Sequence, residues 1–385
     1  MENNKTPSIR FKGFTDPWEQ RKLNEICDYT SSSLTASSSI ENGKYILYDA
    51  NTEIGSVDSF SMNEDYITVI KDGAGVGRIR KLPKNTAFIG TMGALTSKNK
   101  ETDFLYYLLE RKDLSKQFTG STIPHIYFKD YGKDAVNIPK DKEQQVIGSY
   151  FKQLDNLITL HQRKYNKLLN VKKSMLEKMF PKNGSNIPEI RFKGFTDPWE
   201  QRKLCDVVKE ITRNDPESEA PIMMITANNG FIEQSERYAF NNAGESLKKY
   251  ILLKKGELAY NHGASKLRPY GSCFALTTAE NARIPFVYHC FSAENQNAEF
   301  MSIELNGAEI ENQLRKIVSS GARMDGLLNI SFDEYTSVSV LLPGIEEQDC
   351  IADFFRQLDN LITLHQRELE KLQNIKKSML EKMFV

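Results

Sequence analysis

Basic residues gather in two stretches of this 385-residue chain, although 51 basic and 51 acidic residues give it a formal net charge of zero. Residues 71–100 contain seven basic side chains and one acidic side chain, and residues 248–270 contain six and one. A local excess of this kind is typical of a surface that neutralises the phosphates of a nucleic acid. The alternative interpretation is that these lysines protect the exposed edges of β-sheets from aggregation.

Side chains in and near these stretches have the chemistry to contact a DNA duplex. Lys and Arg bind phosphates or guanine, and Asn suits adenine in the major groove. We expect Lys81 and Lys84 to bind phosphates and Arg268 to read a base. In the first half of the chain the candidates are Lys71, Arg78, Arg80, Lys81, Lys84, Ser121, Thr122, His125, Tyr127 and Lys129. In the second half they are Lys248, Lys254, Asn261, His262, Ser265, Lys266, Arg268, Tyr270, Ser320 and Arg323.

Motifs for catalysis and for metal binding are incomplete. DGAGVG at Asp72–Gly77 resembles a phosphate-binding glycine turn, but such a turn opens a helix, whereas the RIRKL that follows predicts a strand. TDPW, at Thr15 and again at Thr196, is one proline short of the motif of amino methyltransferases. His161 and His365 lack neighbouring Cys or Glu, so we interpret them as polar positions of a coiled coil rather than as metal ligands. We therefore expect no catalytic site, metal or cofactor on this chain.

An internal repeat organises the whole sequence. IRFKGFTDPWEQRKL at Ile9–Leu23 returns unchanged at Ile190–Leu204, 181 positions later. QLDNLITLHQR at Gln153–Arg163 and KKSMLEKMF at Lys172–Phe180 both return 204 positions later. Each half therefore consists of a short repeat, a variable middle and a long repeat, and the second middle is 23 residues longer than the first.

The long repeat predicts a helix with a heptad seam. Residues 141–180 contain no proline and one glycine, and their seam positions alternate steps of four and three. Two matching seams can bury each other within one chain, and the alternative is a coiled coil between separate chains. The first seam is Ile147, Phe151, Leu154, Ile158, His161, Tyr165, Leu168, Lys172, Met175 and Met179. The second is Ile351, Phe355, Leu358, Ile362, His365, Leu369, Leu372, Lys376, Met379 and Met383.

Connectivity predicts the direction of these helices. The linker PKNGSNIPE leads from the first helix directly into the second short repeat, so the second helix has to return antiparallel to the first. We expect a rod of roughly 60 Å with one globular domain at each end, and the short repeat as the joint between helix end and domain. The predicted parts are a first domain at 1–139, a helix at 140–180, a linker at 181–189, a second domain at 190–343 and a helix at 344–385.

The two variable middles share an outline despite their dissimilar sequences. In the first, DYITVI, the turn KDGAGVG, RIRKL and TAFIGTMGAL predict short strands, and KYILLKKGELAY, NHGASK and LRPYGSCFAL do so in the second. A helix is predicted after the strands in both, and the fold class is therefore mixed α/β, with one globular unit repeated. Its apolar residues are Phe104, Tyr107, Leu108 and Phe118 in the first middle, and Ile310, Leu314, Ile317 and Val318 in the second. Because the basic stretches occupy the same place in both units, we favour nucleic-acid binding over protection of a sheet edge.

The motifs at the start of the long repeats carry a resemblance to a known family. Pro139, Glu143 and Gln144 form a PxxxEQ motif ahead of IxxxFxQLDxLI, and the motif recurs from Pro343. With two dissimilar domains of one fold, each followed by a near-identical long helix, the chain resembles the specificity subunit of type I restriction-modification systems. The resemblance implies that each middle is a target recognition domain that reads one half of a split, asymmetric site in double-stranded DNA. It implies that the helices fix the gap between the half-sites and dock the partner subunits.

The resemblance also implies a subunit without chemistry of its own. Two modification subunits would methylate adenine with S-adenosylmethionine, and two restriction subunits would hydrolyse ATP with Mg²⁺ and cleave DNA. The alternatives are a chain that is itself a methyltransferase and a coiled-coil adaptor without sequence-specific DNA binding. No apolar run approaches the roughly 18 residues of a membrane span, and MENNKTPSIR lacks the apolar core of a signal peptide, so we expect a cytoplasmic protein without membrane contact.

Overall fold

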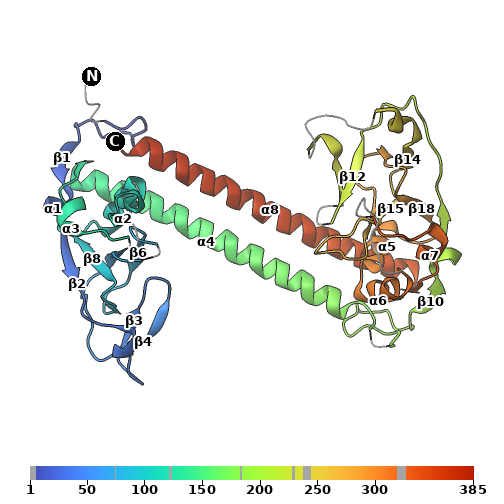
Figure 1. The fold of residues 1–385 in the computed structure, drawn as a ribbon, viewed down its shortest axis with the longest axis horizontal. Helices are drawn as coiled ribbons and strands as arrows, with labels where there is room; N and C mark the ends of the chain where they lie inside the picture. The colour runs from blue at the N-terminus through green and yellow to red at the C-terminus, as the bar shows by residue number, and fades with distance from the viewer. Residues whose placement is uncertain are drawn as a thin grey trace. The chain divides into compact units, whose positions relative to one another are not determined.

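The computed structural model describes residues 6–73, 75–120, 124–182, 184–227, 230–236, 244–318 and 327–385. By its internal contacts the chain divides into a first unit, Met1–Lys164 with His365–Val385, and a second unit, Tyr165–Leu364. The long helices α4 (Asp141–Lys178) and α8 (Ile345–Met383) each begin in one unit and end in the other (Figure 1). Among the described residues no helix is both long and apolar enough to cross a membrane.

A four-stranded antiparallel sheet with the order β2-β8-β5-β6 forms the centre of the first unit. All residues of β5 and β8 are buried, which suits the β-branched and apolar side chains of YITVI. A smaller sheet, β4-β3-β7, and the pair β1-β9 complete the strands. The elements are β1 (Glu19–Lys22), α1 (Leu23–Ile26), β2 (Cys27–Ser31), β3 (Tyr45–Tyr48), β4 (Glu53–Val57), β5 (Tyr66–Ile70), β6 (Ile79–Leu82), β7 (Ala87–Phe88), β8 (Met92–Ser97), α2 (Thr102–Lys112), α3 (Phe128–Tyr131) and β9 (Ala135–Ile138).

The second unit repeats this architecture in a longer sequence. Its main sheet has the order β11-β18-β15-β16, again antiparallel, and it adds the pairs β12-β13, β14-β17 and β10-β19. The elements are β10 (Glu200–Lys203), β11 (Val208–Glu210), β12 (Met223–Thr226), β13 (Gly230–Glu233), β14 (Ile251–Lys254), β15 (Leu258–Asn261), β16 (Ser272–Ala275), β17 (Asn281–Ile284), β18 (His289–Ala293), α5 (Ala298–Leu305), α6 (Ala308–Ile317), α7 (Phe332–Thr336) and β19 (Ser339–Leu342). The predicted mixed α/β fold with a repeated unit is confirmed.

The short repeat joins each unit to the start of a long helix through a buried ion pair. Nε and Nη2 of Arg10 donate to the two carboxylate oxygens of Glu143 at 2.6 and 2.7 Å. In the second unit Arg191 binds Glu347 in the same way, at 2.7 Å for both contacts. Both glutamates are buried, and the two-pronged, charge-assisted geometry compensates for their lost hydration. The Glu of the PxxxEQ motif is therefore part of the joint.

The end of the other long helix enters the same joint through aromatic side chains. In each unit a buried tryptophan of the short repeat packs edge-on against one phenylalanine from a helix of that unit and one from the last residues of a long repeat. These residues are Trp18, Phe104 and Phe384 in the first unit, and Trp199, Phe300 and Phe180 in the second. The repeated sequence thus receives a helix end twice, which accounts for its two copies.

Within each unit α4 and α8 pair antiparallel. In the first unit His161 lies opposite His365, and Phe151, earlier on α4, lies opposite Phe384 at the end of α8. In the second unit Phe180 contacts Phe355. Every residue of both predicted seams is buried or half-buried, as close packing along the paired helices requires.

Two details of the predicted helices are wrong. Phe118 does not belong to α2, because the helix ends at Lys112, where Asp113 takes a left-handed conformation with φ 54°, and Phe118 is 51% exposed. The counterpart of α2 is moreover α5 rather than α6, since Phe300 of α5 packs on its tryptophan as Phe104 of α2 does. The helix α5 is short and has no clear amphipathic stripe, so its sequence carries little helical signal.

Candidate nucleic-acid interface

The loop between β5 and β6, residues 71–78, lies against the segment that precedes α3. Gly73 N–H donates to Pro124 O at 3.1 Å, and Ile126 N–H donates to Lys71 O at 2.9 Å. Gly77, at φ 80°, makes a close approach possible, because a Cβ there would lie 2.5 Å from the backbone of Leu114. The loop and the segment therefore form one surface, which brings together the predicted residues Lys71, Arg78, His125, Tyr127 and Lys129.

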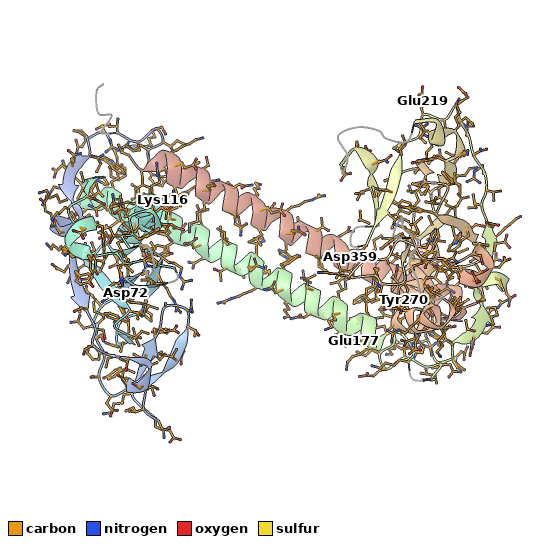
Figure 2. The ribbon with its side chains drawn as sticks, in the orientation of Figure 1. Asp72, Lys116, Glu177, Glu219, Tyr270 and Asp359 are labelled. Carbon is orange, nitrogen blue, oxygen red and sulfur yellow. The ribbon has the colours of Figure 1, made fainter. Side chains whose placement is uncertain are left out.

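An equivalent surface exists in the second unit. Residues 262–271 join β15 to β16, the strands that correspond to β5 and β6 in sheet order. Leu328 N–H donates to His262 O at 2.9 Å, and Gly263 forms an isolated bridge with Leu327, as Asp72 does with His125. Figure 2 labels one residue of each loop, Asp72 in the first unit and Tyr270 in the second. Each unit thus presents a hairpin loop and a neighbouring segment in the same arrangement, with different side chains.

Three comparisons with known proteins bear on this arrangement. The family model of the type I restriction-modification DNA specificity domain matches residues 15–170. The type I restriction enzyme MjaVIII specificity subunit of Methanocaldococcus jannaschii is 27% identical over 351 residues, which cover 83% of this chain and 78% of that protein. A crystal structure of a type I restriction-modification system S subunit from M. genitalium superposes with a TM-score of 0.64 at 15% identity and covers 99% of both chains. The chain is thus similar to the specificity subunits of type I restriction-modification systems.

Several side chains predicted to contact DNA lie on the surface of the first unit. Asp72 Oδ1 lies 2.6 Å from His125 Nδ1, and the rings of His125 and Tyr127 stack with centroids 6.2 Å apart. Lys129 Nζ lies 5.1 Å from the centre of the Tyr127 ring, a cation–π distance. Burial, and then the nearby charge of Asp72, raises the pKa of Tyr29. Tyr127 and Lys129 are exposed, so ring, ammonium and imidazole are available to a ligand.

Two arginines near the loop have partners within the chain. Arg78 is exposed, and its Nη2 donates to the carbonyl of Ala50 and to Asn51 Oδ1, both at 2.6 Å. The guanidinium of Arg80 is half-buried and lies 5.0 Å from the centre of the Tyr48 ring. Arg78 therefore remains at the surface, whereas Arg80 supports the smaller sheet.

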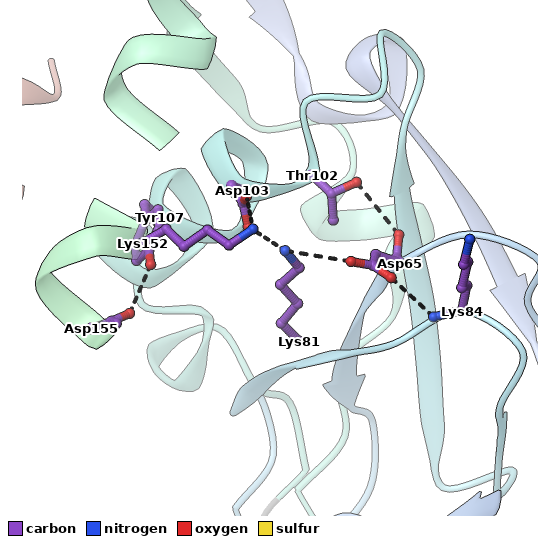
Figure 3. Close-up of polar contacts among 8 residues, drawn as sticks. All are labelled: Asp65, Lys81, Lys84, Thr102, Asp103, Tyr107, Lys152 and Asp155. Carbon is purple, nitrogen blue, oxygen red and sulfur yellow. Dashed lines mark hydrogen bonds and ion pairs between the residues drawn. The ribbon is translucent and has the colours of Figure 1, made fainter. Parts of the chain in front are cut away.

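Lys81 and Lys84, predicted together as phosphate contacts, have different surroundings (Figure 3). Lys81 forms ion pairs with Asp103 of α2 and with Asp65, so its charge holds α2 to β6 and is not free for a phosphate. Asp103 also pairs with Lys152 of α4 at 3.1 Å. Lys84 is exposed, and its contact with Asp65 runs through its backbone N–H alone among the contacts described. Of the two lysines, Lys84 has the geometry of a phosphate contact.

Two polar candidates of the second unit are structural. His262 is buried, with Nδ1 2.7 Å from Leu328 O and Nε2 2.7 Å from Val287 O. Asn261 donates from its amide to Ile225 O and accepts from Gly263 N–H. Both side chains therefore hold the loop in place, a role that the sequence did not indicate.

The tip of the second loop is well ordered by its own hydrogen bonds. Ser265 N–H donates to Arg268 O, and Arg268 N–H donates to Ser265 Oγ, each at 3.0 Å. Arg268 Nη1 donates to Asn306 O at 2.7 Å, and burial lowers the pKa of its guanidinium. Lys266 is exposed, and Leu267 beside it is 64% exposed. Tyr270 is half-buried, and the centre of its ring lies 5.8 Å from Cζ of Arg315.

The remaining candidates lie elsewhere. Lys248 and Lys254 are exposed at the start and the end of the segment that includes β14, outside the hairpin loop. Ser121, Thr122, Ser320 and Arg323 lie outside the described residues. Within the described part of the chain, no group of three or more His, Cys, Asp or Glu side chains could hold a metal ion.

Sequence reasoning missed two residues of these surfaces. Asp72 counts against a basic patch in the sequence, yet it binds His125, 53 positions away, which no local pattern reveals. Leu267 is an apolar residue between Lys266 and Arg268, and it is exposed at the tip of the turn that the hydrogen bonds between Ser265 and Arg268 form. The sequence around Leu267 does indicate exposure, because a single leucine in a loop of Gly, Ser, Lys and Pro cannot reach the core.

Proposed function

We propose that this chain is the specificity subunit of a type I restriction-modification system and reads a bipartite, asymmetric sequence in double-stranded DNA, with one half-site bound by each unit. The observation that carries the proposal is the recurrence of one loop-and-segment surface on the same strands of two sheets, with different side chains on each. A common scaffold with divergent surface residues suits two readers of different sequences. Exposed Lys84, Lys129 and Lys266 supply phosphate contacts beside the readers.

We further propose that α4 and α8 set the number of base pairs between the half-sites. Support comes from the joints, where a buried ion pair and an aromatic cluster attach each helix pair to its unit. A joint of this kind leaves little freedom between the helix end and the sheet.

The partners proposed for the specificity subunit are two modification subunits and two restriction subunits. Exposed leucines recur 204 positions apart on the helix faces away from the seam, at Leu157 and Leu160 in the first unit and at Leu361 and Leu364 in the second. Together with the joints near Trp18 and Trp199, they would form one docking surface per unit. Native mass spectrometry of the active methyltransferase should show two modification subunits for each specificity subunit, and one alone would contradict the duplicated surface.

The chemistry is proposed to reside on those partners. S-adenosylmethionine would be bound by the modification subunits, and ATP and Mg²⁺ by the restriction subunits, while this chain supplies sequence recognition without a catalytic step. Work on chromosomal DNA with these partners would take place in the cytoplasm. The isolated chain should accordingly transfer no labelled methyl group to DNA.

The decisive experiment is methylome sequencing of cells with and without this gene. Loss of one split methylation motif in the deletion strain is the expected result, because both half-sites and their gap depend on this chain. A motif that persists without the gene would contradict the proposal. Failure of the assembled complex to protect any DNA from footprinting would instead favour the adaptor without DNA recognition.

A further inference from the structure

Contacts of both the backbone and the ring fix the position of His125. Its backbone N–H and carbonyl pair with Thr119 at 2.8 and 2.9 Å, and its neighbours Pro124 and Ile126 bind the loop on either side of Asp72. The side chain is bound by Asp72 at 2.6 Å, and the ring stacks against that of Tyr127. Position and ring plane are therefore set before any ligand arrives.

The bond to Asp72 also decides which ring nitrogen carries the proton. An ionised carboxylate accepts hydrogen bonds and cannot donate them, so Nδ1 is the protonated nitrogen. In the singly protonated ring, Nε2 is then an acceptor. The ring is partly exposed, with 36% of the side chain accessible, and its described hydrogen bonds are made through Nδ1. Nε2 is the end that a ligand can meet.

We propose that His125 reads an amino group of adenine or cytosine in the major groove through Nε2, with Asp72 as the positioning residue. This inference rests on the proposed function and names one specificity-determining contact within it. Adenine N6 and cytosine N4 are the donors that the major groove offers to an acceptor, whereas guanine offers two acceptors there. Preorganisation by Asp72 and Tyr127 lowers the entropy cost of making this contact.

The two described residues at the corresponding bridge of the second unit offer no such group. The backbone bridge that joins Asp72 to His125 in the first unit joins Gly263 to Leu327 in the second, where neither residue has a polar side chain. The half-site of the second unit therefore serves as an internal reference: a change at His125 should alter one half of the motif and leave the other half as it is.

The test begins with methylome sequencing of cells in which the gene carries His125→Ala. We expect one base position of one half-site to become relaxed and the other half-site to be unchanged. If the motif is unaltered in both halves, the role of His125 is overturned while the proposed function stands. If the wild-type gene itself specifies no motif, the proposed function fails, and the two failures are thus distinguishable.

Binding of the assembled methyltransferase to duplexes with the wild-type motif then tests the atoms involved. Removal of the amino group, by purine for adenine or pyrimidin-2-one for cytosine at the relaxed position, should weaken wild-type binding about tenfold. The same removal should not weaken binding of the His125→Ala complex, because that complex lacks the imidazole that would accept from the amino group. If replacement of guanine by 7-deazaguanine, which lacks the N7 acceptor, instead weakens binding of the wild-type complex and not of the His125→Ala complex, the assignment of Nε2 as an acceptor is overturned.

Asp72→Asn tests the positioning role, with Asp130→Asn as its matched control. Both substitutions remove one negative charge from the same region, and Asp130 is exposed on α3 without contact to the His125 ring among the contacts described. Asp72→Asn should relax the same base position as His125→Ala, whereas Asp130→Asn should keep the preference. If both variants change the base preference equally, Asp72 acts only through its negative charge, and its positioning role is overturned.

Discussion

Lys376 Nζ lies 2.8 Å from Asp155 Oδ1, and the corresponding lysine of the other repeat, Lys172, lies 2.5 Å from Asp359 Oδ1. Each long helix thus contributes one seam lysine and one aspartate, and each lysine binds the aspartate of the other helix. A polar group that finds its partner in only one alignment specifies the register of paired helices. The two lysines that interrupt the apolar seam therefore select the antiparallel register.

The two ion pairs should differ in energy because their surroundings differ. Lys376 is 15% exposed and also binds Glu110, and these two hydrogen-bonded acids outweigh the burial that would otherwise lower its pKa, so its pKa is raised. Lys172 is 32% exposed and has a half-exposed partner. We expect Lys376→Ala to destabilise the first unit by about 1–3 kcal/mol and Lys172→Ala to cost the second unit about 1 kcal/mol or less. Hydrogen exchange, resolved by unit, measures both, and equal losses would contradict the argument.

Glu304 gives the second unit a predicted dependence on pH. Burial raises the pKa of this carboxyl from 4.5 to about 7, although it accepts a hydrogen bond from Leu341 N–H. At pH values between 4.5 and about 7, folding therefore takes up a proton on Glu304. The stabilisation is complete below about pH 4.5 and is lost as the pH rises through about 7, by about 1–3 kcal/mol.

Glu304→Gln should remove this pH dependence, because the amide can still accept from Leu341 and does not ionise. Glu304→Leu is a second control, since leucine, as Leu108, occupies the corresponding position of α2. The difference in unfolding free energy between wild type and Glu304→Gln, measured from pH 4.5 to 8, should change steadily with pH. Parallel curves would show that Glu304 keeps its ordinary pKa when folded.

Contacts that position DNA should be separable from contacts that read it. Lys84→Ala should weaken binding on all sequences and reduce the salt slope by about one, whereas Arg268→Ala should relax one base position at a cost of about 1–3 kcal/mol. Lys81→Ala should instead lower stability, because its charge pairs with Asp65 and Asp103, and leave the salt slope unchanged. Titrations of the complex at several salt concentrations distinguish the three, and equal effects on specificity would refute this division.

A chain with two copies of one reader tests the proposed architecture. In such a chain residues 24–139 are replaced by residues 205–343, while both short repeats and both long helices are kept. Because the Arg–Glu ion pair and the aromatic cluster recur at both joints and the helices pair antiparallel, we expect the two identical readers to be related by a two-fold axis. The chain should then methylate an inverted repeat of the second half-site, with a gap close to the natural one. A direct repeat, or survival of the original first half-site, would refute the arrangement.

The elements that sequence alone predicts best are those with a periodic or repeated signal. The seams follow from heptad spacing, the strands β5 and β6 follow from short runs on either side of a glycine turn, and the joint follows from an exact repeat beside a helix end. The roles of His262 and Asn261 could not be predicted, because their partners lie 25 to 66 positions away for His262 and up to 36 for Asn261. The ion pairs of Lys81 could not be predicted for the same reason, since a basic residue in a patch has the same sequence signal whether or not an aspartate faces it.

The joint has a consequence for how such chains diversify. The Arg–Glu ion pair and the tryptophan of each joint belong to the repeats, and the second middle is 23 residues longer without any change in the Arg191–Glu347 contact. A middle also binds the helices through residues of its own, as Asp103 and Glu110 of α2 do with Lys152 and Lys376. A middle inherited from another chain with the same flanking segments would therefore attach through the same ion pair and tryptophan wherever its own helix fits the long helices, so a new target can arise by exchange of one interchangeable cassette.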